Sequence, residues 1–301
     1  MPEETETIFY YKRGDPQLTQ ETVLGQSWLK LAYQCAGHGF FETLVFRSSW
    51  LSRIMGMYCD LRLSRRRIRT TIAELEIDVE EFHDAVDSFR TFNEFFTRRL
   101  KLELRPFDPS PETIISPADG RVLVYPRLER DRCVPVKGHA YSADDLLAGD
   151  AGRFHGGAIA VIRLCPADYH RFHFPCSGRI IENRQINGHY HSVNPLALAL
   201  GVNVFPENKR AYSTLETEGA GRVVIMEIGA FGVGSIAWTY HGDNVEKMGE
   251  RGFFKFGGSS IVLLFEPDRV VFAADLVAHS AEGHETLVRV GETIATATSG
   301  K

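Results

Sequence analysis

The sequence predicts an α+β fold, in which a helical N-terminal region (residues 1–105) precedes a β-rich domain (residues 106–301). Large apolar residues recur at helical spacing over residues 20–69 and again over residues 79–102. After Pro106, glycines, prolines and short β-branched runs dominate. Because the helical signals come first and do not alternate with the strand signals, we do not expect repeated βαβ units.

The first helical stretch combines large apolar side chains with arginines. The apolar residues begin at Trp28 and continue through Ile54 and Met55, and arginines cluster from Arg62 to Arg69. This pattern is typical of a helix that lies in a membrane interface. It also fits a pair of helices that pack on the main domain with their arginines in water. The residues alone leave both interpretations open.

Five runs in the second part of the chain predict strands, since each is short and rich in β-branched or apolar residues. They are residues 120–124, 158–164, 223–228, 261–265 and 288–294, the last being a strand, a turn and a second strand.

Composition and charge exclude several classes of protein. The net charge of −5 argues against nucleic acid as the main partner. The five cysteines are an odd number and contain no C-x-x-C pair, which favours a reducing compartment without a disulfide framework or zinc knuckle. The first 14 residues lack the apolar core of a signal peptide. No apolar run reaches the roughly 18 residues of a membrane-spanning helix.

The segment Gly257-Gly258-Ser259 carries the most distinctive chemical signal, because a strand-forming run follows it at once. A glycine can adopt a strained backbone that opens its carbonyl to attack. The hydroxyl of Ser259 could attack the Gly258 carbonyl, convert the amide to an ester and cut the chain by β-elimination, which leaves an electrophilic pyruvoyl group at residue 259. The alternative is an ordinary Gly-Gly-Ser hairpin turn.

Two further motifs could activate this serine. Asp119 lies in the sequence SPADG, and His170 and His173 lie in DYHRFHFP. A histidine base oriented by a carboxylate can activate a serine, either against an external acyl group or against the chain itself. The absence of G-x-S-x-G favours the second. The pairs His170/His173 and His189/His191 are weak metal signals without further ligands, so we expect no metal.

These motifs together resemble the pyruvoyl-dependent phosphatidylserine decarboxylases, in their bacterial type with a Phe-Gly-Gly-Ser cleavage motif. The resemblance runs from about residue 8 to residue 295 and rests on the order and spacing of its motifs. In chain order they are TFNEFFTRRL with RPFD, SPADG, VKGHAYSADDLL, DYHRFHFP and GFFKFGGSS. One departure is Ser260, where threonine is usual, and it keeps the hydroxyl.

The resemblance implies roles for particular residues. Asp119, His173 and Ser259 would form the triad for self-cleavage between Gly258 and Ser259, giving a β chain (1–258) and an α chain (259–301). Ser259 would become a covalent pyruvoyl cofactor that forms a Schiff base with the substrate amine. His170 would assist decarboxylation or the later protonation.

The resemblance also implies partners and a location. The substrate would be phosphatidylserine, converted to phosphatidylethanolamine and CO2 in phospholipid biosynthesis. The α and β chains would stay together as a heterodimer, with higher homo-oligomers left open. The enzyme would be peripheral, on the cytoplasmic side of the cell membrane, and a lipid substrate favours the membrane interpretation of residues 28–69. Rival interpretations are a pyruvoyl decarboxylase of a soluble amino acid, an uncleaved Asp-His-Ser hydrolase and a non-catalytic lipid-binding relative.

Overall fold

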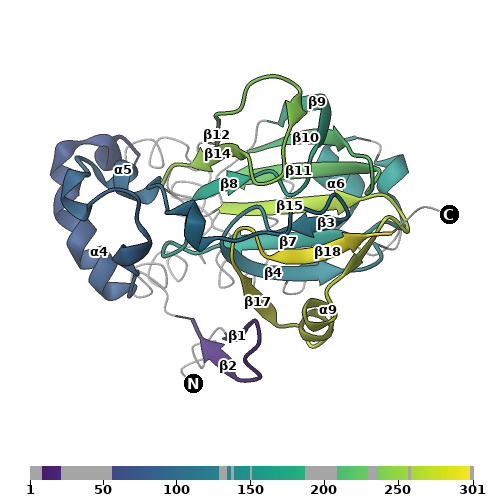
Figure 1. Ribbon diagram of the computed structural model, residues 1–301, viewed down its shortest axis with the longest axis horizontal. Helices are drawn as coiled ribbons and strands as arrows, with labels where there is room; N and C mark the ends of the chain where they lie inside the picture. Colours follow the sequence, from purple (N-terminus) through teal and green to yellow (C-terminus); the bar gives the residue numbers. More distant parts are fainter. Residues whose placement is uncertain are drawn as a thin grey trace, which may run out of the picture.

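The computed structural model describes residues 9–21, 56–128, 134–136, 139–149, 151–186, 209–229, 236–256 and 259–298. Its main feature is a ten-stranded sheet, which occupies one side of the molecule in Figure 1. Neighbouring strands are antiparallel except for the parallel pair β1–β17. In spatial order the strands are β13 (Asn244–Val245), β9 (Gly178–Ile186), β10 (Arg210–Glu216), β11 (Arg222–Gly229), β15 (Ser259–Phe265), β7 (Ile159–Leu164), β4 (Gly120–Tyr125), β17 (Glu285–Val288), β1 (Phe9–Lys12) and β2 (Leu18–Gln20).

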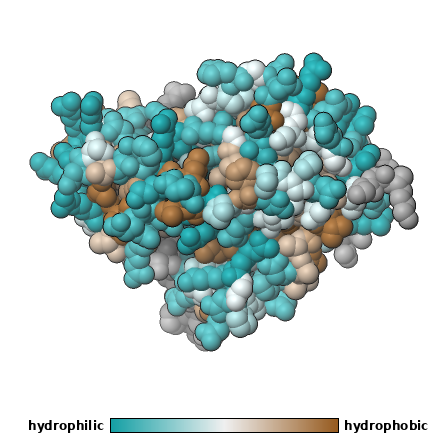
Figure 2. All heavy atoms as spheres, viewed as in Figure 1, coloured by the Kyte–Doolittle hydropathy of each residue, from teal (hydrophilic) through white to brown (hydrophobic). Residues whose placement is uncertain are grey.

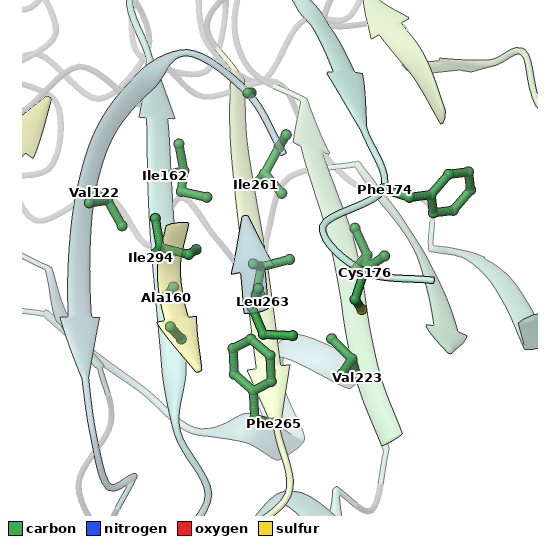
Figure 3. Close-up of a cluster of buried hydrophobic side chains, with 14 of the residues drawn as sticks. Val122, Ala160, Ile162, Phe174, Cys176, Val223, Ile261, Leu263, Phe265 and Ile294 are labelled. Atoms are coloured by element: carbon green, nitrogen blue, oxygen red, sulfur yellow. The ribbon is translucent and has the colours of Figure 1, made fainter. Parts of the chain in front are cut away.

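Both faces of this sheet are covered at its centre, which explains why β15 is apolar at every position from Ile261 to Phe265. Along β15, Ile261, Leu263 and Phe265 point into one buried cluster, whereas Val262 and Leu264 point into another. The first cluster is shown in Figure 3, where side chains from β15 meet those of β4, β7 and β11.

Two small sheets pack over the first cluster. One contains β12 (Ile236–Trp238), β14 (Glu250–Phe254) and β8 (Arg171–His173), and the other contains β16 (Val270–Phe272), β18 (Thr293–Ala297) and β3 (Thr113–Ile115). Helix α9 (Ala274–Ala281) adds Leu276 to the same cluster. The second cluster lies under α6 (Ala143–Leu147) and the 3-10 turn η5 (Gly152–Phe154). Just before α6 in the chain, β5 (Val134–Val136) and β6 (His139–Tyr141) form a separate two-stranded sheet.

The helical part lies at one end of the molecule (Figure 1). Its elements are a helical turn at 56–60, η1 (Arg62–Arg67), α4 (Ile68–Glu74), η2 (Val79–Glu81), η3 (Val86–Ser88), α5 (Phe92–Phe96) and η4 (Leu102–Leu104). An aromatic cluster joins this part to the sheet domain, because it also includes Tyr169, Met248 and Val290. On the face shown in Figure 2 hydrophilic residues predominate, and several groups of hydrophobic ones lie where the two parts meet.

The five predicted strand regions are confirmed. The helical stretch predicted over residues 79–102 is confirmed only in part, because its helical elements are the short η2, η3 and α5, separated by non-helical residues. Phe82, Phe89, Phe92 and Phe95 all enter the aromatic cluster, and the chain folds back so that Phe82 bridges Leu100. Burial of these rings outweighs the local helical preference.

The α+β class is confirmed, but residues 1–105 are not wholly helical. Within this range, β1 and β2 extend the main sheet, and Tyr10 of β1 is buried there. Much of the predicted helical stretch at 20–69 lies outside the described residues, including the apolar positions from Trp28 to Met55. No helix among the described residues is long and apolar enough to cross a membrane.

Candidate active site

Ser259 is the first residue of β15, at the centre of the main sheet. It pairs with Gly229 of β11 on one side and with Leu164 of β7 on the other. Its side chain is fully buried on the same face of the sheet as Ile261 and Leu263. Its Oγ lies 3.2 Å from Nδ1 of His170. The serine hydroxyl therefore contacts a histidine directly, at the start of a central strand.

The surroundings of His170 fix its tautomer. Its Nε2 lies 3.0 Å from the carbonyl oxygen of Cys165. A carbonyl oxygen only accepts hydrogen bonds, so Nε2 carries the proton and Nδ1 keeps a free lone pair. The ring also stacks on Phe96, with 3.8 Å between centroids. Nδ1 of His170 is consequently an acceptor for the Ser259 hydroxyl.

The charge state of His170 follows from the same environment. Burial, reinforced by the positive charge of Arg98, lowers the pKa of His170 to about 3, against the opposing effect of the Cys165 hydrogen bond. The imidazole is therefore neutral at physiological pH. A neutral imidazole with a free lone pair is the form that can remove a proton from a hydroxyl.

His173 lies on β8 and is held in the opposite tautomer. Its Nδ1 lies 2.8 Å from the carbonyl oxygen of Met248, so Nδ1 carries the proton. Its Nε2 accepts a hydrogen bond from the Tyr169 hydroxyl at 3.3 Å. Burial lowers the pKa of His173 as well. Both ring nitrogens of His173 are thus engaged by groups other than Ser259.

Asp119 immediately precedes β4, whose first residue, Gly120, allows close packing. A Cβ at Gly120 would lie 2.8 Å from the Arg163 carbonyl oxygen, so only glycine fits after the aspartate. Oδ1 of Asp119 accepts a hydrogen bond from the Val290 backbone N–H at 2.8 Å, and Oδ2 accepts one from Arg105 at 3.1 Å. Burial raises the pKa of Asp119, although both of these donors favour the charged form.

The structure therefore joins some of the predicted residues and separates others. His170 and Ser259 are hydrogen-bonded to each other. The loop of Asp119 runs beside β8, because the His173 backbone N–H donates to the Pro117 carbonyl oxygen at 2.8 Å. Among the described residues, no side-chain hydrogen bond links Asp119 or Ser259 to His173.

Other predicted positions lie outside the described residues, namely Gly258 and the pair His189/His191. Within the described part of the chain, no group of three or more His, Cys, Asp or Glu residues is arranged to hold a metal. Cys59, Cys165 and Cys176 are free thiols.

Sequence reasoning missed the partners that orient these groups. Arg105, Tyr169 and the carbonyl of Cys165 each contact a predicted site residue. Arg105 and Tyr169 stand in the RPFD and DYHRFHFP motifs, so the motifs contained the signal. Every residue has a backbone carbonyl, so no residue type in the sequence could have indicated the role of the Cys165 carbonyl.

Comparisons with known proteins identify the family of the chain. Residues 92–296 match the model of the phosphatidylserine decarboxylase family. The chain is 40% identical to the phosphatidylserine decarboxylase proenzyme of Ruminiclostridium cellulolyticum, over 95% of this chain and 97% of the relative. Proenzymes of the same name from Clostridium botulinum (strain Langeland) and Clostridium perfringens (strain SM101) are 40% and 38% identical, over 95% of this chain and 98% and 99% of theirs. On this similarity, which extends over nearly its whole length, the chain belongs to the phosphatidylserine decarboxylase family.

Proposed function

We propose that this protein decarboxylates phosphatidylserine to phosphatidylethanolamine after it has cut its own chain before Ser259. Family membership supports the reaction, and the relatives' designation as proenzymes supports activation by cleavage. The observation that carries the proposal is the contact between the buried Ser259 hydroxyl and the unprotonated Nδ1 of His170.

Self-cleavage uses this contact first. Nδ1 of His170 removes the hydroxyl proton, and Oγ of Ser259 attacks the carbonyl carbon of residue 258. As the amide C–N bond breaks and the ester forms, Nδ1 passes the proton to the nitrogen of residue 259, which becomes an amine. Loss of the α-proton then expels the carboxylate of residue 258, and hydrolysis releases ammonia and leaves a ketone.

The roles of the two histidines are a separate part of the proposal. The resemblance assigns the triad to Asp119, His173 and Ser259, whereas the contact in the uncut chain supports His170 as the base. For His173 to reach Ser259, it would have to give up its hydrogen bond from Tyr169. Asp119 is hydrogen-bonded to Arg105 and to the Val290 N–H, so in this arrangement it orients the loop beside β8.

Residue 259 fits the covalent pyruvoyl group that the family implies. Its side chain is buried at the start of a central strand and faces a histidine nitrogen with a free lone pair. The group supplies an electrophilic ketone and an electron sink for the charge left when CO2 departs. Nδ1 of His170 lies against residue 259 and carries no proton in this arrangement. We propose that it first takes up a proton from the ammonium group of the substrate and then delivers that proton to the substrate carbon.

After cleavage, the α and β chains would remain associated as a heterodimer. Strand β15 begins the α chain and is hydrogen-bonded to β11 and β7, both of which belong to the β chain. The α chain also contributes Leu263, Phe265 and Ile294 to the main buried cluster. Burial of these side chains gives the fragments a stable interface without a covalent link.

Exposed side chains of the helical part support a membrane-facing surface. Met57, Leu61 and Leu63 are 59%, 56% and 56% exposed, and the arginines at 62 and 65–67 lie among them and are also exposed. Exposed apolar side chains beside arginines suit a surface of anionic lipid. We propose that this surface holds the enzyme peripherally, on the cytoplasmic side of the cell membrane.

Co-sedimentation with vesicles tests this surface. Leu61→Ser/Leu63→Ser should lower binding to phosphatidylserine-containing vesicles several-fold, and Leu102→Ser/Leu104→Ser, an exposed pair elsewhere, serves as the matched control. Equal binding by both double variants would contradict the assignment.

Release of CO2 from carboxyl-labelled substrate tests the function. The wild type should release labelled CO2 from phosphatidylserine in mixed micelles, and Ser259→Ala should release none. Release from free serine but not from the lipid would favour a decarboxylase of a soluble amino acid. Hydrolysis of an ester substrate by an uncut chain would favour the hydrolase.

A further inference from the structure

A short turn precedes the histidine that contacts Ser259. The Asp168 backbone N–H donates to the Cys165 carbonyl oxygen at 2.9 Å, which closes a turn over residues 165–168 with Pro166 in its second position. The carboxylate of Asp168 reaches back and accepts a hydrogen bond from the Cys165 N–H at 2.6 Å. Asp168 thus binds both backbone polar groups of Cys165.

The same carbonyl oxygen of Cys165 accepts the Nε2 proton of His170. The Cys165 carbonyl oxygen therefore accepts two hydrogen bonds, one that closes the turn and one that sets the tautomer of His170. Because this oxygen takes the Nε2 proton, the nitrogen that lies against Ser259, Nδ1, carries no proton.

Two buried arginines hold the turn, one through the Asp168 side chain and the other through backbone carbonyls. Nη1 of Arg121 lies 2.6 Å from Oδ1 and 2.5 Å from Oδ2 of Asp168. Nη2 of Arg98 donates to the carbonyl oxygens of Ala167 and Asp168, at 2.9 and 3.1 Å. The guanidinium of Arg98 is itself packed against the rings of Phe82 and Phe95. Charge-assisted bonds of this kind are strong and geometrically specific.

We propose that Asp168 is a positioning residue for His170, because it fixes the Cys165 carbonyl that takes the Nε2 proton and so leaves Nδ1 free toward residue 259. This role rests on one part of the proposed function, namely that His170 acts on atoms of residue 259. It holds whether His170 serves self-cleavage, decarboxylation or both.

Loss of the Asp168 carboxylate should release this constraint. Asp168→Asn keeps the size of the side chain but places an uncharged amide against the Arg121 guanidinium. Arg121 then loses its nearest anionic partner and keeps only Glu21, whose Oε1 lies 4.0 Å from its Nε. Once the Cys165 oxygen can move, a neutral His170 can carry its proton on Nδ1 instead. In that tautomer the nitrogen facing Ser259 is a donor and cannot accept the hydroxyl proton.

Nitrogen-15 NMR of histidine-labelled, uncut protein tests the proposal. In Ser259→Ala we expect His170 with a bare Nδ1 and a protonated Nε2, and His173 with the reverse. Adding Asp168→Asn should shift the His170 nitrogens toward the other tautomer and leave those of His173 unchanged. In the chain that retains Ser259, Asp168→Asn should slow self-cleavage or lipid decarboxylation at least about tenfold.

Asp144→Asn is the matched control. Asp144 also accepts a backbone hydrogen bond, from the Ala151 N–H at 2.6 Å, but it lies by the buried cluster on the other face of the sheet. It should leave the His170 nitrogens and the rates unchanged.

The proposal is overturned if the His170 nitrogens in Asp168→Asn match those in Asp144→Asn, since a purely structural role would leave the tautomer as it was. If Asp168→Asn fails to fold, Arg121→Gln removes the partner and retains the aspartate, and the same shift of His170 is expected. The NMR measurement does not require cleavage, so a tautomer shift would support Asp168 even in a protein that never cuts itself.

Discussion

The two sides of the candidate site are held in place by different physical means. Ser259 is placed by the central strand β15, which is hydrogen-bonded to β11 on one side and to β7 on the other. The side chains of β15 on the same face as Ser259 pack in the main buried apolar cluster. His170 and His173 are placed by backbone carbonyls, an aromatic ring and a tyrosine hydroxyl. The strand side relies on many interchangeable contacts, and the histidine side relies on a few specific ones. Substitutions of similar severity should therefore affect chemistry much more on the histidine side.

The largest effect is expected from the histidines themselves. His170→Gln should slow self-cleavage by about 10²–10⁴-fold, since the group that accepts the Ser259 proton is lost. His173→Gln removes a histidine of the same burial that does not contact Ser259. Electrophoresis of the two fragments over time after synthesis gives both rates.

A stronger loss of cleavage in His173→Gln than in His170→Gln would reverse these roles. It would support the triad implied by the resemblance and require His173 to move toward Ser259 before the reaction.

The next effect compares the two sides directly. Phe96→Ala and Leu263→Ala each remove a fully buried side chain and should each lower the free energy of unfolding by roughly 2–5 kcal/mol. Only Phe96 stacks on His170. Below the unfolding midpoint, Phe96→Ala should therefore cleave more slowly than Leu263→Ala. Denaturant titration in the Ser259→Ala background measures the free energy of unfolding of both variants, so that their stabilities can be compared. Equal cleavage rates at equal stability would show that the Phe96 ring has no part in orienting His170.

The smallest effect is a pH dependence of stability. The pKa of His170 is about 3 in the folded chain and about 6.5 when unfolded. Between these values the unfolded chain binds more protons, so stability is present above pH 6.5 and is lost as the pH falls toward 3. The slope from this histidine is at most about 1.4 kcal/mol per pH unit.

Urea unfolding of Ser259→Ala between pH 7 and pH 4.5 measures this slope. His170→Gln in the same background should flatten it. An unchanged slope would mean that His170 is not held neutral.

The sheet side of the site could be predicted from sequence, and the histidine side could not. The run after Ser259 is apolar at every position from Ile261 to Phe265, so a buried strand that begins near the serine followed from local pattern alone. The choice between His170 and His173 depends on the carbonyl oxygens of Cys165 and Met248, which hold the two rings in opposite tautomers. Met248 lies far away along the chain, and a carbonyl is common to every residue.

The same distinction explains the errors in the fold. The predicted helix over 79–102 had suitable local spacing, but its phenylalanines meet Tyr169 and Val290 of the sheet domain, which no local pattern reveals. Strand β1 was not predicted, because its partner β17 lies near the other end of the chain. In both cases a contact distant in sequence determined the structure.

Intact-mass spectrometry of the purified wild-type chain beside Ser259→Ala tests the central claim most directly. We predict two wild-type fragments of about 29 and about 5 kDa, from chains of 258 and 43 residues. The smaller should carry a ketone in place of the N-terminal amine of Ser259, and the variant should remain whole. A folded wild-type chain that stays intact in the presence of membranes would contradict the account.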